Sequence, residues 1–224
     1  MKHDDTFRDD PSSAVTNPPF RRASLTVHVT LLGDSIFDSR PYLHGQPDMA
    51  SRVAAIANCR ATLLAVSGSR LADVAHQASR IPADTTHLMV SAGGNDILDL
   101  GRRLRSEPGN LLQRVGQMGE MLGEFRQRYS AACRDIAARG LPAALCTIYE
   151  PPLGDPLLRQ LGLAALHMIN SAIETEARAC GLEIIDLRVV CREPADFFDP
   201  IHPSAHGADK IAATLARWIG SQRR

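Results

Sequence analysis

Four short polar segments of the chain contain residue types that suit nucleophilic catalysis. A serine hydroxyl attacks a carbonyl carbon well only when a nearby base takes its proton. Each segment is interrupted by Gly or Pro and follows an apolar run. In chain order the segments are Gly33-Asp34-Ser35-Ile36-Phe37, Val66-Ser67-Gly68-Ser69-Arg70, Gly93-Gly94-Asn95-Asp96 and Asp199-Pro200-Ile201-His202-Pro203-Ser204. Together they contain a serine, a histidine and several carboxylates, which are the groups needed for attack on an ester.

We predict that Ser35 is the nucleophile, because a tight turn after a strand can present its hydroxyl to a cleft. His202 is the predicted base, since an imidazole changes charge near neutral pH. Asp199 lies three residues before His202. Its carboxylate is expected to accept the Nδ1–H of the imidazole, which fixes the tautomer and stabilises the imidazolium.

Attack on an ester carbonyl places negative charge on the carbonyl oxygen, and three groups are candidates to bind this oxyanion. Gly68 offers a backbone N–H with no side chain in the way, and Asn95 offers its side-chain amide. Ser35 offers its own backbone N–H. Removing one donor of this kind typically costs about 2.7–4 kcal/mol in the transition state.

Each of these residues also has a purely structural interpretation. Ser35 or Asp199 can cap a helix, while Gly68 and Asn95 are common in turns. Asp196 is a rival to Asp199 as the carboxylate that orients the histidine. We favour the catalytic interpretation because all four segments occur in one chain.

Three neighbouring side chains also have secondary interpretations. Asp34 is expected to support the nucleophile turn, and Asp96 to cap the helix that follows GGND. Arg70 can reach an acidic group of a substrate, although a solvated arginine is the preferred interpretation.

A metal site is an alternative use of Asp199, His202 and His206, because two histidines four residues apart share a helix face. Pro203 argues against it, since a residue before proline is pushed away from helical geometry. His206 is then an exposed residue or one that supports the site. The chain has no HExxH, Walker A, GxGxxG, GxSxG or SxxK pattern. We therefore predict an enzyme without a metal or cofactor.

The order of Ser35, Gly68, Asn95 and His202 resembles that of the SGNH, or GDSL-type, hydrolase family. GDSIF is similar to the first family block, VSGS to the second, GGND to the third and DPIHPS to the Asp-x-x-His block. The resemblance extends over roughly residues 25–219. It implies a flavodoxin-like fold, ester hydrolysis through an acyl-enzyme, and the same catalytic and oxyanion roles for these residues.

The substrate is predicted to be a small acyl ester. Phe37, Tyr42 and Leu43 follow the nucleophile and are expected to line an apolar acyl pocket. Phe37 stands where many family members have a smaller or polar residue. Thioesterase, lysophospholipase or acyltransferase action by the same triad is the alternative. A non-catalytic binding module is disfavoured because every required group is present.

Five apolar runs alternate with amphipathic segments, a pattern typical of parallel strands joined by helices. The predicted strands are 25–32, 61–66, 86–91, 143–149 and 182–187, and the predicted helices are 48–57, 71–79, 111–139, 156–180 and 204–219. The pattern predicts a three-layer α/β/α sandwich around a five-stranded parallel sheet. Ligands of such folds bind beyond the carboxyl ends of the strands, where the polar segments are expected to meet.

Length and charge limit the remaining possibilities. The chain has 224 residues and no net charge, with 25 basic and 25 acidic side chains. This balance argues against nucleic acid or anionic lipid as a partner, and no apolar run is long enough to span a membrane. Residues 1–23 are predicted to be a disordered polar leader, and 24–224 to be one domain. The leader lacks the apolar stretch of a secretory signal, so a cytoplasmic location is expected.

The five cysteines are scattered and include no CxxC pair. A disulfide framework or a zinc site requires closer patterning. We expect them to be reduced and mostly buried.

Overall fold

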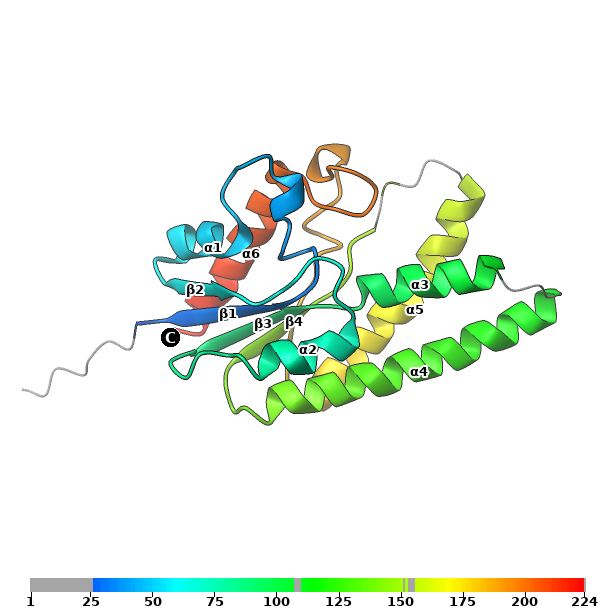
Figure 1. Cartoon of the computed structure of the whole chain (residues 1–224), viewed down its shortest axis with the longest axis horizontal. Coiled ribbons are helices and arrows are strands. Elements are labelled where there is room, and N and C mark those ends of the chain that lie inside the picture. Colours follow the sequence, from blue (N-terminus) through cyan, green and yellow to red (C-terminus); the bar gives the residue numbers. More distant parts are fainter. Residues whose placement is uncertain (1–25, 107–109, 151, 153–155, 224) are drawn as a thin grey trace, which may run out of the picture.

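The computed structural model describes residues 26–106, 110–150, 152 and 156–223. At its centre is a five-stranded sheet in which all neighbouring strands are parallel (Figure 1). The strands are β1 (His28–Gly33), β2 (Arg60–Leu63), β3 (His87–Ser91), β4 (Ala143–Cys146) and β5 (Glu183–Ile185). Their order across the sheet is β2-β1-β3-β4-β5. The predicted parallel sheet is therefore confirmed.

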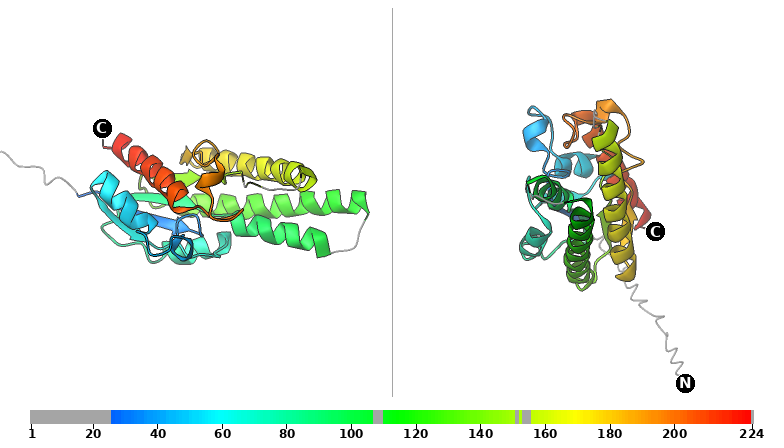
Figure 2. Two further views of the ribbon diagram at one scale, coloured as in Figure 1. Left: turned by 90° about the horizontal axis from the view of Figure 1, so that it is seen from above. Right: turned by 90° about the vertical axis from the view of Figure 1, so that its right-hand side faces the viewer.

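Helices cover both faces of this sheet (Figure 1, Figure 2). Helices α1 (Met49–Ala57) and α6 (Ala205–Ser221) pack together on one face. Helices α2 (Leu71–Ala78), α4 (Leu111–Ala137) and α5 (Pro156–Ala179) lie on the other face. Helix α3 (Gly94–Ser106) begins just after β3 and continues past the end of the sheet beside α4. The arrangement confirms the predicted α/β/α sandwich.

Each face of the sheet has its own hydrophobic core. Side chains alternate between the two faces of a strand, and β1 is buried on both of them. Val29 and Leu31 pack in the core under α1 and α6, whereas Leu32 packs in the core under α2, α4 and α5. This burial holds β1 in the interior of the sheet, so its carboxyl end has a fixed position.

Most predicted elements are present, with ends that differ by a few residues. The predicted strands at 61–66 and 143–149 end earlier, at Leu63 and Cys146. Asp48 caps α1 by accepting the N–H of Ser51 at 2.8 Å. Ser204 caps α6 by accepting the N–H of Gly207 at 3.1 Å. Both caps satisfy backbone N–H groups that the helix itself cannot pair.

The predicted disordered leader, residues 1–23, lies outside the described residues. Within the described part of the chain, no helix is both long and apolar enough to cross a membrane. The cysteines are all free, and three of the five are buried. Burial raises the pKa of the Cys133 thiol to about 12 and the pKa of the Cys191 thiol likewise to about 12, so both are unreactive side chains of the core.

Candidate active site

The turn that carries Ser35 depends on a glycine at the end of β1. Gly33 has a φ of +126°, and a Cβ built on it would lie 1.8 Å from the carbonyl oxygen of Ser91 on β3. Only glycine fits a backbone that is both left-handed and so close to the neighbouring strand. The next residue, Asp34, donates its N–H to the same carbonyl at 3.0 Å. Ser35 therefore follows directly at the carboxyl edge of the sheet, as predicted.

The Asp34 side chain supports this turn from inside. Its carboxylate accepts the N–H of Ile36 at 3.1 Å, and the residue is 2% exposed. Burial raises the pKa of Asp34 from an ordinary 3.8 to about 7, against hydrogen bonds from the N–H groups of Ile36 and Gly94 that lower it. The expected supporting role of Asp34 is borne out by these contacts.

His202 and Asp199 contact each other in the loop before α6. The Nδ1 atom of His202 is 2.8 Å from Oδ2 of Asp199 and 3.0 Å from Oδ1. Oδ1 also accepts the backbone N–H groups of Ile201 and His202, both at 2.8 Å. Burial acts to raise the pKa of Asp199, but the hydrogen bonds from His202 and Ile201 outweigh it and lower the pKa overall. The carboxylate is thus ionised, and its contact with Nδ1 leaves Nε2 of His202 as a proton acceptor.

Tyr42 brings the nucleophile segment and the histidine loop together. It ends a short 3₁₀ helix, Arg40–Tyr42. Its ring stacks on the imidazole of His202, with centroids 3.7 Å apart and planes inclined by 16°. The segments after β1 and before α6 accordingly lie side by side (Figure 1). Residues separated by 160 positions in the chain thus share one site.

The other two predicted pocket residues have a different location. Phe37 is 0% exposed and Leu43 is 1% exposed, and both pack in the core beneath α1 and α6. Burying such a side chain stabilises the fold by about 1.5–3 kcal/mol. Phe37 and Leu43 therefore face the core in this structure, whereas Tyr42 contacts His202. An acyl pocket lined by all three residues stays a prediction.

Hydrogen bonds link the remaining two segments to the nucleophile turn. Asp38 accepts the N–H of Ser67 at 3.0 Å, which ties the Gly68 turn to the residues after Ser35. Gly68 has a φ of +85°, and a Cβ there would meet no atom within 4 Å. Asn95 donates one amide hydrogen to the carbonyl of Ser69 at 2.9 Å, which leaves its second amide hydrogen for another acceptor. The segment after Ser35, the Gly68 turn and the Asn95 amide are thus joined by hydrogen bonds.

Asp96 and Arg70 each contact a partner on another element. Asp96 accepts the N–H of Leu71 at 3.0 Å, which caps α2, and it also bonds its own backbone N–H in the first turn of α3. Burial raises the pKa of Asp96. Arg70 forms an ion pair with Asp99 of α3 and remains more than half exposed. The exposure of Arg70 agrees with the predicted solvated arginine, whereas the partners Leu71 and Asp99 were not predicted because each lies on a different element.

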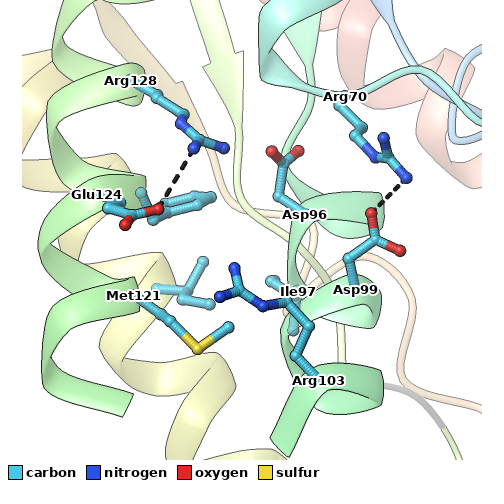
Figure 3. Close-up of a pocket in the computed structure, with 10 residues that line it drawn as sticks. Arg70, Asp96, Ile97, Asp99, Arg103, Met121, Glu124 and Arg128 are labelled. Atoms are coloured by element: carbon cyan, nitrogen blue, oxygen red, sulfur yellow. Dashed lines mark hydrogen bonds and ion pairs between the residues drawn. The ribbon is translucent and has the colours of Figure 1, made fainter. Parts of the chain in front are cut away.

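These two residues border a separate, charged pocket of about 190 Å³ between α3 and α4 (Figure 3). Its polar lining consists of Arg70, Asp96, Asp99, Arg103, Glu124 and Arg128. Ser35, Asp199 and His202 do not line it. The pocket is therefore distinct from the candidate catalytic groups.

Asp196 does not compete with Asp199 for His202. It is fully buried, and its Oδ2 accepts the N–H groups of Arg192 and Glu193 and the ammonium of Lys210, at 2.8–2.9 Å. Burial raises its pKa, but these bonds lower it overall. The nearest carboxylate contact of His206 is also Asp196, at 3.7 Å. The alternative metal site of Asp199, His202 and His206 is thus divided, since His206 faces Asp196 and His202 faces Asp199.

Glu193, Asp196 and His206 themselves form a group whose ligand atoms lie within 4.8 Å of one another. The Lys210 ammonium already occupies one Asp196 oxygen at 2.9 Å. The group connects the histidine loop to α6, because His206 and Lys210 of that helix contact Asp196. Sequence reasoning did not predict the group because Glu193 and Asp196 belong to a short 3₁₀ turn whose contact with His206 of α6 has no sequence signal.

Tyr149 is a further supporting residue that the sequence did not reveal. Its hydroxyl donates to the carbonyl of Ile201 at 2.6 Å, next to His202, and the side chain is nearly fully buried. Burial raises its pKa well above the usual value, so the hydroxyl keeps its proton. The bond fixes the loop that carries the imidazole.

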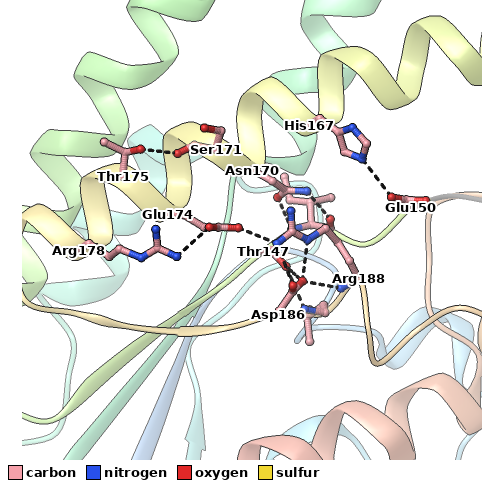
Figure 4. A network of polar contacts seen from close by, with 12 residues as sticks. Thr147, Glu150, His167, Asn170, Ser171, Glu174, Thr175, Arg178, Asp186 and Arg188 are labelled. Carbon is pink, nitrogen blue, oxygen red and sulfur yellow. Dashed lines mark hydrogen bonds and ion pairs between the residues drawn. The ribbon is translucent and has the colours of Figure 1, made fainter.

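A polar network holds the chain where it leaves β4 and β5 (Figure 4). Asn170 of α5 pairs with both the N–H and the carbonyl of Ile148, each at 2.8 Å. Thr147 donates to Asp186 at 2.8 Å, and Arg188 joins Asp186 to Glu174 of α5. The segment that ends in Tyr149 is therefore fixed against α5 before it reaches the histidine loop.

A known protein family matches most of the chain. Residues 31–210 match the model of the GDSL-like Lipase/Acylhydrolase family, and all four polar segments fall within that range. No curated protein sequence matches the chain significantly.

Several solved structures have a similar fold. An extracellular lipase from Streptomyces rimosus has a TM-score of 0.63 at 17% identity, with 85% of this chain and 99% of that chain covered. A lipase/acylhydrolase from Enterococcus faecalis also reaches 0.63 at 19% identity, covering 88% and 96%. Phospholipase A1 from Streptomyces albidoflavus NA297 reaches 0.62 at 15% identity, covering 88% and 99%. At these identities the likeness establishes the fold.

Proposed function

Because the chain belongs to the GDSL-like lipase/acylhydrolase family, we propose that it is a serine esterase that hydrolyses small acyl esters through an acyl-enzyme on Ser35. Membership of the family makes the protein a hydrolase, and the proposal adds the nucleophile, the mechanism and the substrate class. The observation that supports it most is the pair of contacts between Nδ1 of His202 and the Asp199 carboxylate, at 2.8 and 3.0 Å.

In the first half of the proposed reaction, the Oγ–H proton of Ser35 passes to Nε2 of His202 as Oγ bonds to the carbonyl carbon. The resulting imidazolium is stabilised by ionised Asp199. The tetrahedral intermediate then collapses, its carbon–oxygen bond to the alcohol breaks, and His202 returns the proton to the departing oxygen. The product is an ester of Ser35 and a free alcohol.

In the second half, a water molecule replaces the alcohol. His202 takes a proton from water as the water oxygen bonds to the acyl carbon. Collapse breaks the bond to Ser35 Oγ, which takes the proton back from His202. The acid is released and the free enzyme is restored, so the two halves consume one water per ester.

The oxyanion of both intermediates is proposed to bind the N–H groups of Ser35 and Gly68 and the second amide hydrogen of Asn95. The bond from Asn95 to the Ser69 carbonyl supports this role, because it fixes the amide before substrate arrives. Donors that are already oriented require no reorganisation as charge develops. A Cβ built on Gly68 would meet no atom within 4 Å, so there is open space beside this residue.

Hydrolysis of p-nitrophenyl esters from acetate to decanoate tests the proposal, with Ser35→Ala as the control. We expect the wild-type protein to release nitrophenolate and the variant to lose at least about 10³-fold in rate. Equal rates for both proteins would exclude Ser35 as the nucleophile. The same assay with added alcohol measures transfer: an ester product in place of the acid would identify an acyltransferase, and faster turnover of acyl thioesters a thioesterase.

A further inference from the structure

An aromatic cluster lies against the candidate base. Tyr42 stacks on His202 with a centroid distance of 3.7 Å. The ring of Phe198 lies 5.7 Å from that of Tyr42 and 5.4 Å from that of His44. Phe198 also donates its backbone N–H to the carbonyl of His202 at 2.9 Å. Two separate loops thus contribute rings to one wall beside the imidazole.

This wall is open to solvent. Phe198 is 48% exposed and Ile201, in the same loop, is 41% exposed. Single exposed apolar side chains are common on protein surfaces. Here, however, the exposed ring contacts Tyr42, which stacks on the histidine. The apolar surface is therefore located where a substrate meets the base.

The chemistry of the proposed reaction decides which part of the substrate lies there. His202 must give its proton to the departing alcohol oxygen, so this oxygen lies within hydrogen-bond reach of Nε2. The group attached to that oxygen consequently extends along the surface next to the imidazole. The acyl group is a separate substituent of the carbonyl carbon and does not share this surface.

We propose that Tyr42 and Phe198 form the binding site for the alcohol portion of the ester, and that this portion is apolar, such as an aryl-alkyl or alkyl alcohol. The inference rests on the proposed function and adds the class of alcohol. Tyr42 also has a second role: its stacked ring limits rotation of the His202 imidazole, which must reach the leaving oxygen.

The test compares acetate esters of 2-phenylethanol and ethanol, so that the acyl group is constant. Both are primary alkanols, which keeps leaving-group chemistry alike. We expect the wild-type protein to have the higher kcat/KM for the phenylethyl ester. An aromatic pair contributes about 0.5–1.5 kcal/mol beyond the area it buries, so Phe198→Ala is expected to reduce the ratio of the two kcat/KM values roughly 2- to 12-fold.

Two further variants complete the design. Tyr42→Ala is expected to reduce the same ratio. Ile56→Ala is the matched control, because Ile56 is also an exposed apolar residue but lies in the last turn of α1, which leads back to the start of β2. Its ratio is expected to equal that of the wild type. Inhibition by free 2-phenylethanol provides an independent measure, and it should weaken in Phe198→Ala.

The outcomes separate this inference from the proposed function. A ratio that stays at the wild-type value in both Phe198→Ala and Tyr42→Ala, while Ser35→Ala abolishes hydrolysis, would overturn the alcohol site alone. Hydrolysis that survives in Ser35→Ala would instead refute the proposed function. Because Phe198 is half exposed, its truncation leaves the core intact and the variant is expected to fold.

Discussion

Asp34 offers a test of how the nucleophile turn is built. Its carboxyl is buried, and burial raises its pKa from 3.8 to about 7. In the unfolded chain the group has lost its proton by pH 5, whereas in the folded protein it keeps the proton until about pH 7. The folded state therefore holds one more proton across this interval, and stability falls as the pH rises through it.

The size of the effect follows from the width of the interval. Each pH unit over which the folded state holds one extra proton changes the free energy of unfolding by about 1.36 kcal/mol. Two units, from pH 5 to pH 7, amount to about 2.7 kcal/mol by the same conversion. Asp34→Asn removes this dependence while its side-chain oxygen can still accept the N–H of Ile36.

Urea unfolding at pH 5 and pH 8 measures the effect. We expect the wild type to lose about 2.7 kcal/mol more than Asp34→Asn between the two pH values. Asp135→Asn, which removes an exposed carboxylate from α4, controls for the loss of one charge. If Asp34→Asn and the wild type lose the same free energy, within about 1 kcal/mol, the carboxyl is ionised in the folded protein at pH 5 and the reasoning is wrong.

Three further substitutions test separate parts of the site. Asn95→Ala is expected to lower kcat about 10²–10³-fold while KM changes little, as steady-state kinetics would show, and an unchanged kcat would remove Asn95 from the oxyanion site. Gly33→Ala is expected to lower the melting temperature, because its Cβ would lie 1.8 Å from the Ser91 carbonyl oxygen; a thermal scan that matches the wild type would contradict the close approach. Tyr149→Phe leaves the Ile201 carbonyl without its partner, so chemical unfolding should show a loss of about 1–3 kcal/mol together with a lower kcat, and full activity would show that the bond does not position the histidine loop.

The candidate catalytic segments could be identified from the sequence because each is a short local pattern. Gly33 and Ser35 lie two residues apart in the chain, and Asp199 and His202 lie three residues apart, so short spacing alone brings each pair together. The alternation of apolar runs and amphipathic segments predicted the sheet, since parallel strands must be joined by crossovers. The carboxyl ends of the strands then had to share one edge.

The residues that the sequence did not reveal act over long separations. Tyr149 reaches Ile201 across 52 positions, and Asp96 reaches Leu71 across 25. No local pattern encodes such pairs. The burial of Phe37 and Leu43 was also hidden, because an apolar residue after the nucleophile can equally enter a core or line a pocket. The stacking of Tyr42 on His202 joins two loops that are far apart in the chain, so it too has no local signal.

Covalent labelling is the most direct test of the proposal that Ser35 is an activated nucleophile. A fluorophosphonate reacts with a serine only where a base and an oxyanion site activate it. We expect one adduct on the wild-type protein, located at Ser35 by peptide mass spectrometry, and none on Ser35→Ala. Asp199→Asn should label far more slowly, because the histidine loses its ionised partner. An adduct on another residue, or equal labelling of wild type and Ser35→Ala, would show that Ser35 is not the nucleophile.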